Sequence, residues 1–229
     1  MNKVIPTDER VFMAVVGPSG SGKTQLIHKM LKGSTFVPRF DKIYYFYQEY
    51  QPLYDEMQKD LNIEFVPCID FEMIEKLNNC LLIFDDSCEE IYENKRFSKI
   101  ATSGRHKNVN VIFIKHNLFH QSKHSRTIDL NTTHVVLFKS PRDVNQISYF
   151  GKQMNNAPFL KDCFIKATEN VYGHLMVDFS PRTSEPLRYS SNIAGPAPSV
   201  FYLPSSKAVV TSINNERERL AYTQALYQT

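Results

Sequence analysis

The chain has 229 residues, 42% of them hydrophobic and 22% charged, and its net charge is +3 at pH 7. These values exclude a collagen-like or intrinsically disordered chain, and the net charge is too small to identify a partner. No apolar run reaches the ~18 residues that span a bilayer, so we expect no membrane segment. The four cysteines form no Cys-x-x-Cys pair, which indicates free thiols in a reducing compartment.

Predicted strands and helices alternate along the chain. Apolar or aromatic runs predict strands, and the amphipathic runs between them predict helices. The predicted strands are 11–16, 42–47, 63–67, 80–85, 109–115 and 134–139, and the predicted helices are 25–32, 51–60, 71–78, 95–102, 142–154 and 157–168. Residues 174–179 and 187–189 are expected to pair as a hairpin around Pro181. This alternation predicts an α/β fold with a mostly parallel central sheet and helices on both faces.

The C-terminal part of the chain differs in composition from the rest. Residues 190–206 are rich in proline and serine, which predicts an extended arm, and residues 214–228 have the pattern of an amphipathic helix. The sequence therefore predicts a domain over residues 1–189, followed by a C-terminal arm and helix over residues 190–229.

A glycine-rich loop follows the first strong strand. Its eight residues match G-x-x-x-x-G-K-[ST] between a strand and a helix, which is the context in which this motif binds phosphate. The glycines let backbone N–H groups converge on an anion at the helix N-terminus. Lys23 is expected to contact the β- and γ-phosphates, and Thr24 to hold Mg²⁺. The predicted nucleotide-binding residues are Gly17, Pro18, Ser19, Gly20, Ser21, Gly22, Lys23 and Thr24.

Two carboxylates, Asp85 and Asp86, end the strand predicted over residues 80–85. Neighbouring side chains on a strand face opposite ways, so the two carboxylates are suited to different roles. Asp85 is expected to complete the Mg²⁺ site with Thr24. Asp86 is expected to orient the water that attacks the γ-phosphate.

Missing motifs narrow the class of nucleotide hydrolase. The N-K-x-D motif that reads guanine is absent, because Asn94-Lys95 is followed by Arg96-Phe97, and no L-S-G-G-Q motif occurs. The carboxylate pair favours an ATPase with an additional strand between the phosphate-loop strand and the metal-binding strand. The apolar run 109–115 is the predicted additional strand, and His116 at its end is a candidate sensor of the γ-phosphate. Residues 1–189 are then a P-loop ATPase domain that binds ATP and Mg²⁺.

A basic stretch lies between Glu93 and Asp129, which enclose no acidic residue. A long stretch of one charge sign indicates contact with an anion, here DNA phosphates or the nucleotide of a neighbouring subunit. A solvated basic face is the alternative. The eight cationic residues of this stretch are Lys95, Arg96, Lys99, Arg105, Lys107, Lys115, Lys123 and Arg126.

The sequence resembles a known family over roughly residues 10–190. The run 97–120, together with 126–131, 135–139 and 172–175, is similar to the genome-packaging ATPases of Polinton-, adintovirus- and poxvirus-type double-stranded DNA viruses. These belong to the FtsK–HerA superfamily of DNA-pumping motors. The resemblance is more specific than the phosphate loop, which many unrelated families share.

The resemblance implies a motor that moves double-stranded DNA into a viral capsid. It implies a homo-oligomeric ring, pentameric or hexameric, with capsid or portal-vertex proteins as partners, inside the infected cell or with the virion. Lys23, Asp86, Arg105 and His116 would be the catalytic residues, with Arg105 acting across a subunit boundary. Arg126 and Arg142 are the reserve candidates for that role. His116 stands where such motors usually place a glutamine.

Two other classes of function remain open from the residues. A small-molecule kinase shares the phosphate loop but needs an acceptor pocket, and usually a lid that bears an arginine. A nucleotide-dependent switch or assembly protein hydrolyses little nucleotide, so a catalytic carboxylate at Asp86 would be superfluous.

Overall fold

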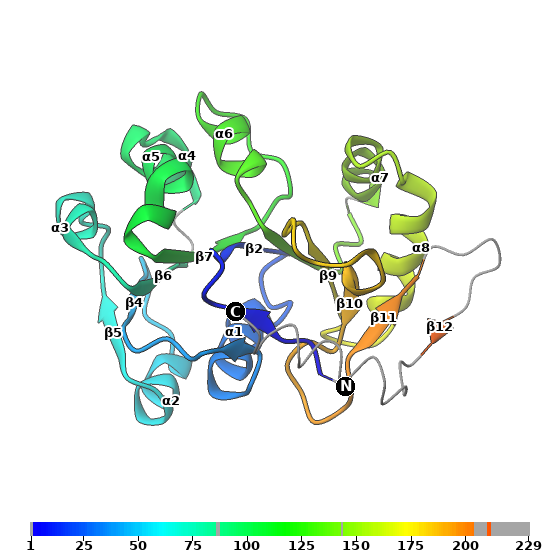
Figure 1. Ribbon diagram of the computed structural model, residues 1–229, viewed down its shortest axis with the longest axis horizontal. Coiled ribbons are helices and arrows are strands. Elements are labelled where there is room, and N and C mark those ends of the chain that lie inside the picture. The colour runs from blue at the N-terminus through cyan, green and yellow to red at the C-terminus, as the bar shows by residue number, and fades with distance from the viewer. Residues whose placement is uncertain (1, 86–87, 143, 204–209, 212–229) are drawn as a thin grey trace.

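The computed structural model describes residues 2–85, 88–142, 144–203 and 210–211. Its centre is a ten-stranded sheet with the strand order β12-β11-β10-β9-β8-β2-β7-β6-β4-β5 (Figure 1). A separate pair of parallel strands comprises β1, Ile5–Pro6, and β3, Phe36–Val37. The strands of the large sheet are β2 Phe12–Val16, β4 Ile43–Phe46, β5 Ile63–Val66, β6 Cys80–Phe84, β7 Val109–Lys115, β8 His134–Phe138, β9 His174–Asp178, β10 Tyr189–Ser191, β11 Val200–Tyr202 and β12 Val210–Thr211.

Six strands, from β5 to β8 in the sheet order, run parallel. Strand β7 lies between β2, which leads into the glycine-rich loop, and β6, which leads to Asp85. The α/β fold class and the additional strand predicted from the sequence are therefore confirmed. Because parallel strands end at the same edge of a sheet, β2, β6 and β7 bring their C-terminal residues together there.

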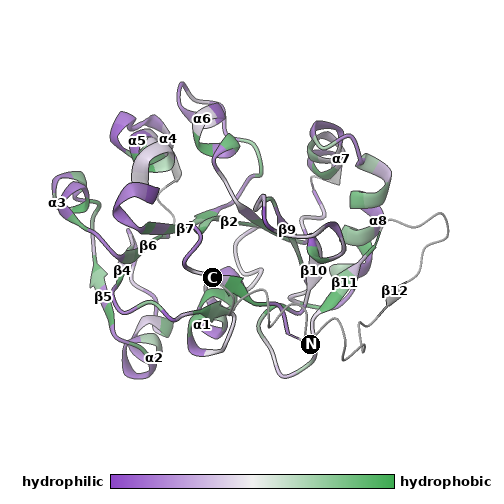
Figure 2. Ribbon diagram, in the orientation of Figure 1, coloured by the Kyte–Doolittle hydropathy of each residue, from purple (hydrophilic) through white to green (hydrophobic). Residues whose placement is uncertain are grey.

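Helices cover both faces of this sheet (Figure 1). Side chains of α1 and α2 pack on one face, and side chains of α3 to α8 pack on the other. Figure 2 shows hydrophobic residues concentrated in the strands, while the surrounding helices mix polar and apolar residues. The helices are α1 Lys23–Lys32, α2 Leu53–Asp60, α3 Phe71–Lys76, α4 Cys88–Glu93, α5 Lys95–Ser103, α6 Ser125–Leu130, α7 Val144–Gln153 and α8 Ala157–Ala167.

Strand β2 shows why both faces of the sheet must be covered by helices. Its residues Phe12, Ala14 and Val16 belong to the core under α3 to α8, whereas Met13 and Val15 belong to the core under α1 and α2. Alternate side chains of a strand point to opposite faces, so a strand that is apolar throughout is stable only when both faces are buried.

The sheet continues past the parallel part through antiparallel strands. Strand β9 pairs with β8, and β10 pairs with both β9 and β11, so the hairpin expected around Pro181 is confirmed. The expectation of an extended arm from residue 190 is wrong for the residues that the structure describes. Ser190, Ser191 and Val200–Tyr202 are strand residues, and Phe201 and Tyr202 are buried. The predicted helix over 214–228 lies outside the described residues.

A buried ion pair fixes the N-terminal segment to this antiparallel part. The Lys3 ammonium lies 2.7 Å from a carboxylate oxygen of Asp178 and also donates a hydrogen bond to the Leu187 carbonyl. The other oxygen of Asp178 lies 3.5 Å from Nε2 of the buried His134. A buried pair of this kind holds because each charge has a partner, and it is costly to break by removing one of them.

His134 is expected to make the fold sensitive to acid. Burial lowers the pKa of His134 from 6.5 to about 4. The unfolded chain therefore takes up a proton near pH 6.5 that the folded chain does not accept until about pH 4. The free energy of unfolding should be unaffected by this group above pH 6.5. It should fall by ~3 kcal/mol between pH 6.5 and pH 4, at 1.36 kcal/mol per pKa unit.

Denaturant unfolding of the parent and of His134→Gln, at half-unit pH steps, measures this effect. The variant should lose less stability than the parent between pH 6.5 and pH 4. Parallel pH profiles for the two proteins would show that His134 is not the titrating group.

Candidate nucleotide-binding site

The glycine-rich loop connects β2 to α1, and its path depends on glycines such as Gly17 and Gly22. Gly22 precedes α1 with φ +94°, in the left-handed region that favours glycine. A Cβ at Gly17 would lie 2.6 Å from Cβ of Phe138 on β8, which is too close for any side chain. The Gly17 N–H donates to the Lys115 carbonyl at 3.0 Å, which joins the loop to the end of β7.

The loop has the chemistry to hold an anion. The Lys23 ammonium curls over the loop and donates to the carbonyls of Gly17 and Pro18, each at 2.9 Å. Ser21 Oγ is buried and has no hydrogen-bond partner in the described part of the chain. The Lys23 ammonium and the main-chain N–H groups that begin α1 are donors that a phosphate chain can bind. The residues present therefore fit a bound phosphate chain.

Asp85 lies directly beside the loop and is almost fully buried. Its Oδ2 accepts hydrogen bonds from Thr24 Oγ1 at 3.3 Å, from the Tyr45 hydroxyl at 2.6 Å and from the Tyr54 hydroxyl at 3.1 Å. The structure thus brings together the two residues predicted to hold Mg²⁺, Thr24 and Asp85. A hydroxyl next to a carboxylate is the donor set expected for a hard cation bound with the phosphates.

The two tyrosines that position Asp85 were not predicted from the sequence. Burial, together with the negative charge of Asp85, raises the pKa of Tyr45 well above its usual value, so Tyr45 keeps its proton and remains a hydrogen-bond donor. Tyr45 and Tyr54 pack with their rings 5.0 Å apart. Together they fix the orientation of the Asp85 carboxylate.

Tyr45→Phe is expected to weaken the use of Mg²⁺. The substitution removes a 2.6 Å hydrogen bond to Asp85, and removing such a support around a metal ligand typically costs ~10-fold or more in metal affinity or activity. We expect the Mg²⁺ concentration for half-maximal ATP hydrolysis to rise by about that factor. Tyr44→Phe is the matched control, because Tyr44 is adjacent and packs on the opposite face of β4. Equal Mg²⁺ curves for the two variants would contradict this role for Tyr45.

A cavity of about 620 Å³ opens where these residues meet. It brings together most of the predicted site, since Ser19, Gly20, Gly22, Lys23, Thr24, Asp85 and His116 all line it. Further lining residues come from parts of the chain that the sequence did not connect with the loop: Gln51, Leu53, Phe138, Tyr172, His174 and Ala194. A cavity of this size is in the range of small-molecule sites.

Two further residues, Asp86 and Arg105, were predicted to be catalytic. Asp86 lies outside the described residues. Arg105 is exposed in a 3-10 turn, Gly104–Lys107, that precedes β7, so it lies at the opposite edge of the sheet from the phosphate loop. Arg10 is close by, and burial together with the nearby Arg105 lowers its pKa to about 10. Arg105 is therefore not among the residues that line the nucleotide cavity of its own chain.

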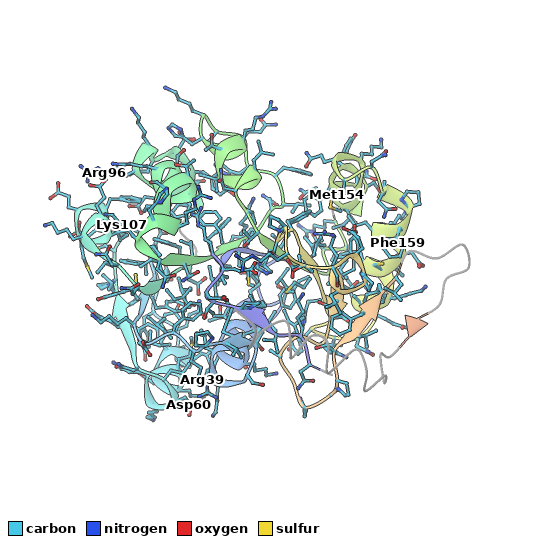
Figure 3. All side chains as sticks on the ribbon, in the orientation of Figure 1. Arg39, Asp60, Arg96, Lys107, Met154 and Phe159 are labelled. Carbon is cyan, nitrogen blue, oxygen red and sulfur yellow. The ribbon has the colours of Figure 1, made fainter. Side chains whose placement is uncertain are left out.

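The basic stretch does not form one surface. Lys115 is buried and lies 3.2 Å from Asp129, and Arg96 lies 3.9 Å from both Glu72 and Glu75. Figure 3 labels Arg96 and Lys107 on the side of the molecule that holds α3 and α5. Lys123 and Arg126 follow the other end of β7, at the phosphate-loop edge.

Arg142, the second reserve candidate, is exposed and follows β8 at that same edge. Arg126 and Arg142 thus share an edge of the sheet with the phosphate loop, whereas Arg105 does not. None of the helices in the described ranges is long and apolar enough to cross a membrane.

Comparisons with known proteins identify the fold. No protein-family model matches the chain, and no curated protein does. Among solved structures, the genome packaging NTPase B204 from Sulfolobus turreted icosahedral virus 2, in complex with AMP, matches with a TM-score of 0.53 at 14% identity, over 82% of this chain and 98% of that chain. Its complex with ATP-gammaS matches with a TM-score of 0.51 at 15% identity, over 77% of this chain and 95% of that chain. Its complex with sulfate matches with a TM-score of 0.51 at 16% identity, over 76% of this chain and 94% of that chain.

The chain is therefore similar in fold to a viral genome-packaging NTPase, as the resemblance in sequence predicts. The match covers 98% of the AMP-bound B204 chain, so the likeness extends over nearly the whole of that fold. With the loop, Thr24 and Asp85 around one cavity, the chain has the fold of a P-loop NTPase of the additional-strand type.

Proposed function

From this fold and this site, we propose that the protein is an ATP-driven motor that moves double-stranded DNA into a viral capsid. The observation that supports it most is the single cavity lined by the phosphate loop, Asp85 and His116, in a fold shared with a packaging NTPase. DNA, further copies of the chain in a ring of five or six, and capsid or portal-vertex proteins are the proposed partners. Its place is inside the infected cell or with the virion.

The residues of the site divide the work of hydrolysis. Backbone N–H groups of the loop and the Lys23 ammonium bind the phosphates, and Thr24 and Asp85 hold Mg²⁺. The bound cation supplies charge neutralisation at the phosphoryl group that is transferred. Asp86 orients the attacking water and draws its proton, and His116 contacts the γ-phosphate from the end of β7. Such fixed charges and donors stabilise the transition state because they are already in place.

Arg105 completes the site of a neighbouring subunit in this proposal. Its exposed position, away from the phosphate loop of its own chain, supports a role between subunits. Arg105→Ala and Lys23→Ala subunits should each be inactive alone. Mixed together, they should recover part of the activity, because some interfaces then pair an intact loop with an intact arginine. The same mixture made with Arg126→Ala or Arg142→Ala tests the reserve candidates.

The mass of the particle, measured in the sample used for ATPase rates, tests the proposed assembly. With ATP and duplex DNA the mass should rise to that of five or six chains, and turnover should rise with it. DNA contacts should be independent of sequence and weaken with salt, since phosphates carry no sequence information. A monomeric mass under all conditions, with an ATPase rate that DNA does not change, would contradict the proposal.

A further inference from the structure

Tyr172 occupies an unusual place at the mouth of the nucleotide cavity. It is 66% exposed and has φ +61°, a backbone conformation that bulky side chains rarely adopt. The Gly173 N–H donates to the Asn170 carbonyl at 3.0 Å, so Tyr172 is the third residue of a tight turn, where a positive φ favours glycine or asparagine. Strain of this kind is concentrated at functional sites.

The ring of Tyr172 lies over the phosphate loop. A Cβ placed on Gly22 would be 3.1 Å from Cδ1 and 3.6 Å from Cγ of the Tyr172 ring. The cavity continues from Gly22 along α1, where it is lined by Gln25, Leu26 and Lys29. Phosphates bound by the loop would leave this continuation for the nucleoside, next to an exposed aromatic ring.

His174, two residues further, also lines the cavity and contacts the turn that carries Tyr172. The side chain is 8% exposed, and its Nδ1 lies 3.3 Å from the Tyr172 carbonyl. A carbonyl only accepts, so Nδ1 bears the proton. Burial lowers the pKa of His174, so the ring is neutral and Nε2 is an acceptor.

We propose that Tyr172 forms the nucleoside subsite of the motor: the base stacks on the Tyr172 ring, whose turn is held by the hydrogen bond from His174 Nδ1 to the Tyr172 carbonyl. The proposal rests on the proposed ATP-binding function. Aromatic rings hold bases through their faces. The subsite therefore discriminates nucleotides from phosphate chains of the same charge.

Binding of ATP and of inorganic tripolyphosphate to the parent and to two variants tests this subsite. Tyr172→Asn and Tyr172→Gly both remove the ring, and both residues suit the left-handed turn. Each should bind ATP about tenfold more weakly and tripolyphosphate as tightly as the parent, a tenfold change being 1.4 kcal/mol. Tyr149→Ala is the control, since Tyr149 is 61% exposed on α7 and is not among the residues that line the cavity.

A second measurement uses the absence of tryptophan from the chain. Tyr172→Trp introduces a single indole, whose fluorescence ATP and AMP should quench and tripolyphosphate should not. Unchanged ATP affinity in Tyr172→Asn, equal weakening of both ligands, or no quenching by AMP would overturn the subsite. A parent that binds neither ATP nor tripolyphosphate would instead overturn the proposed function.

Discussion

Replacing Lys23 with alanine is expected to abolish ATP hydrolysis, with a loss of about 100-fold or more, because the triphosphate loses its charge-assisted hydrogen bonds. The ammonium already lies within the loop, at 2.9 Å from the carbonyls of Gly17 and Pro18. A bound phosphate chain offers it stronger, negatively charged acceptors at the same place. The loss should be visible in ATP binding itself, measured by calorimetry, as well as in turnover.

Lys32→Ala provides the control for this substitution. Lys32 is also on α1, but its side chain is 59% exposed and pairs with Asp60 at 2.7 Å, at the far end of the helix. It should bind and hydrolyse ATP like the parent. Near-parental binding of ATP by Lys23→Ala would show that the loop does not hold the phosphates.

Asp86→Asn is expected to separate ATP binding from hydrolysis. The amide keeps the size of the side chain but cannot draw a proton from the attacking water, and loss of such a group typically lowers kcat by 10²–10⁴. Lys23, Thr24 and Asp85 are unchanged, so the dissociation constant for ATP should stay within about threefold of the parent. Single-turnover hydrolysis and equilibrium binding of the same preparation give the two values.

Glu89→Gln and Glu90→Gln are the matched controls for Asp86, because both are exposed carboxylates in the first turn of α4, close by in sequence. Neither should change kcat by more than about twofold. If Asp86→Asn hydrolyses ATP at the parental rate, the water-orienting role belongs to another residue. The same conclusion follows if Glu89→Gln and Glu90→Gln lower kcat as much as Asp86→Asn does.

The strands of the parallel sheet were predictable because each is a short apolar run between helices. The predicted strand 80–85 is β6, Cys80–Phe84, and 109–115 is β7. Helices α4 and α6 have only six residues each, too short to show a helical period. Strand β10 reads Tyr-Ser-Ser and has no hydrophobic run, so it exists through its pairing with β9 and β11. Pairing of this kind is a tertiary effect that composition does not reveal.

The site was predictable where residues follow one another or end neighbouring strands, as Gly17–Thr24 and Asp85 do. Tyr45 looks like a core residue in its strand, and only the fold shows its hydroxyl on Asp85. The basic residues between Glu93 and Asp129 do not form a single surface, because strand β7 separates them. Strand β7 has seven residues at ~3.3 Å each, which carries the chain from one edge of the sheet to the other and separates Arg105 from Lys123.

The most direct test of the central claim is movement along DNA. A labelled third strand bound to a duplex is released when a motor travels through it, so release reports translocation and not merely ATP turnover. The parent protein should displace the third strand only with ATP, on duplexes of unrelated sequence, and Lys23→Ala should not displace it. A parent that hydrolyses ATP in the same tube, yet leaves the third strand bound on every duplex, would contradict a DNA-translocating motor.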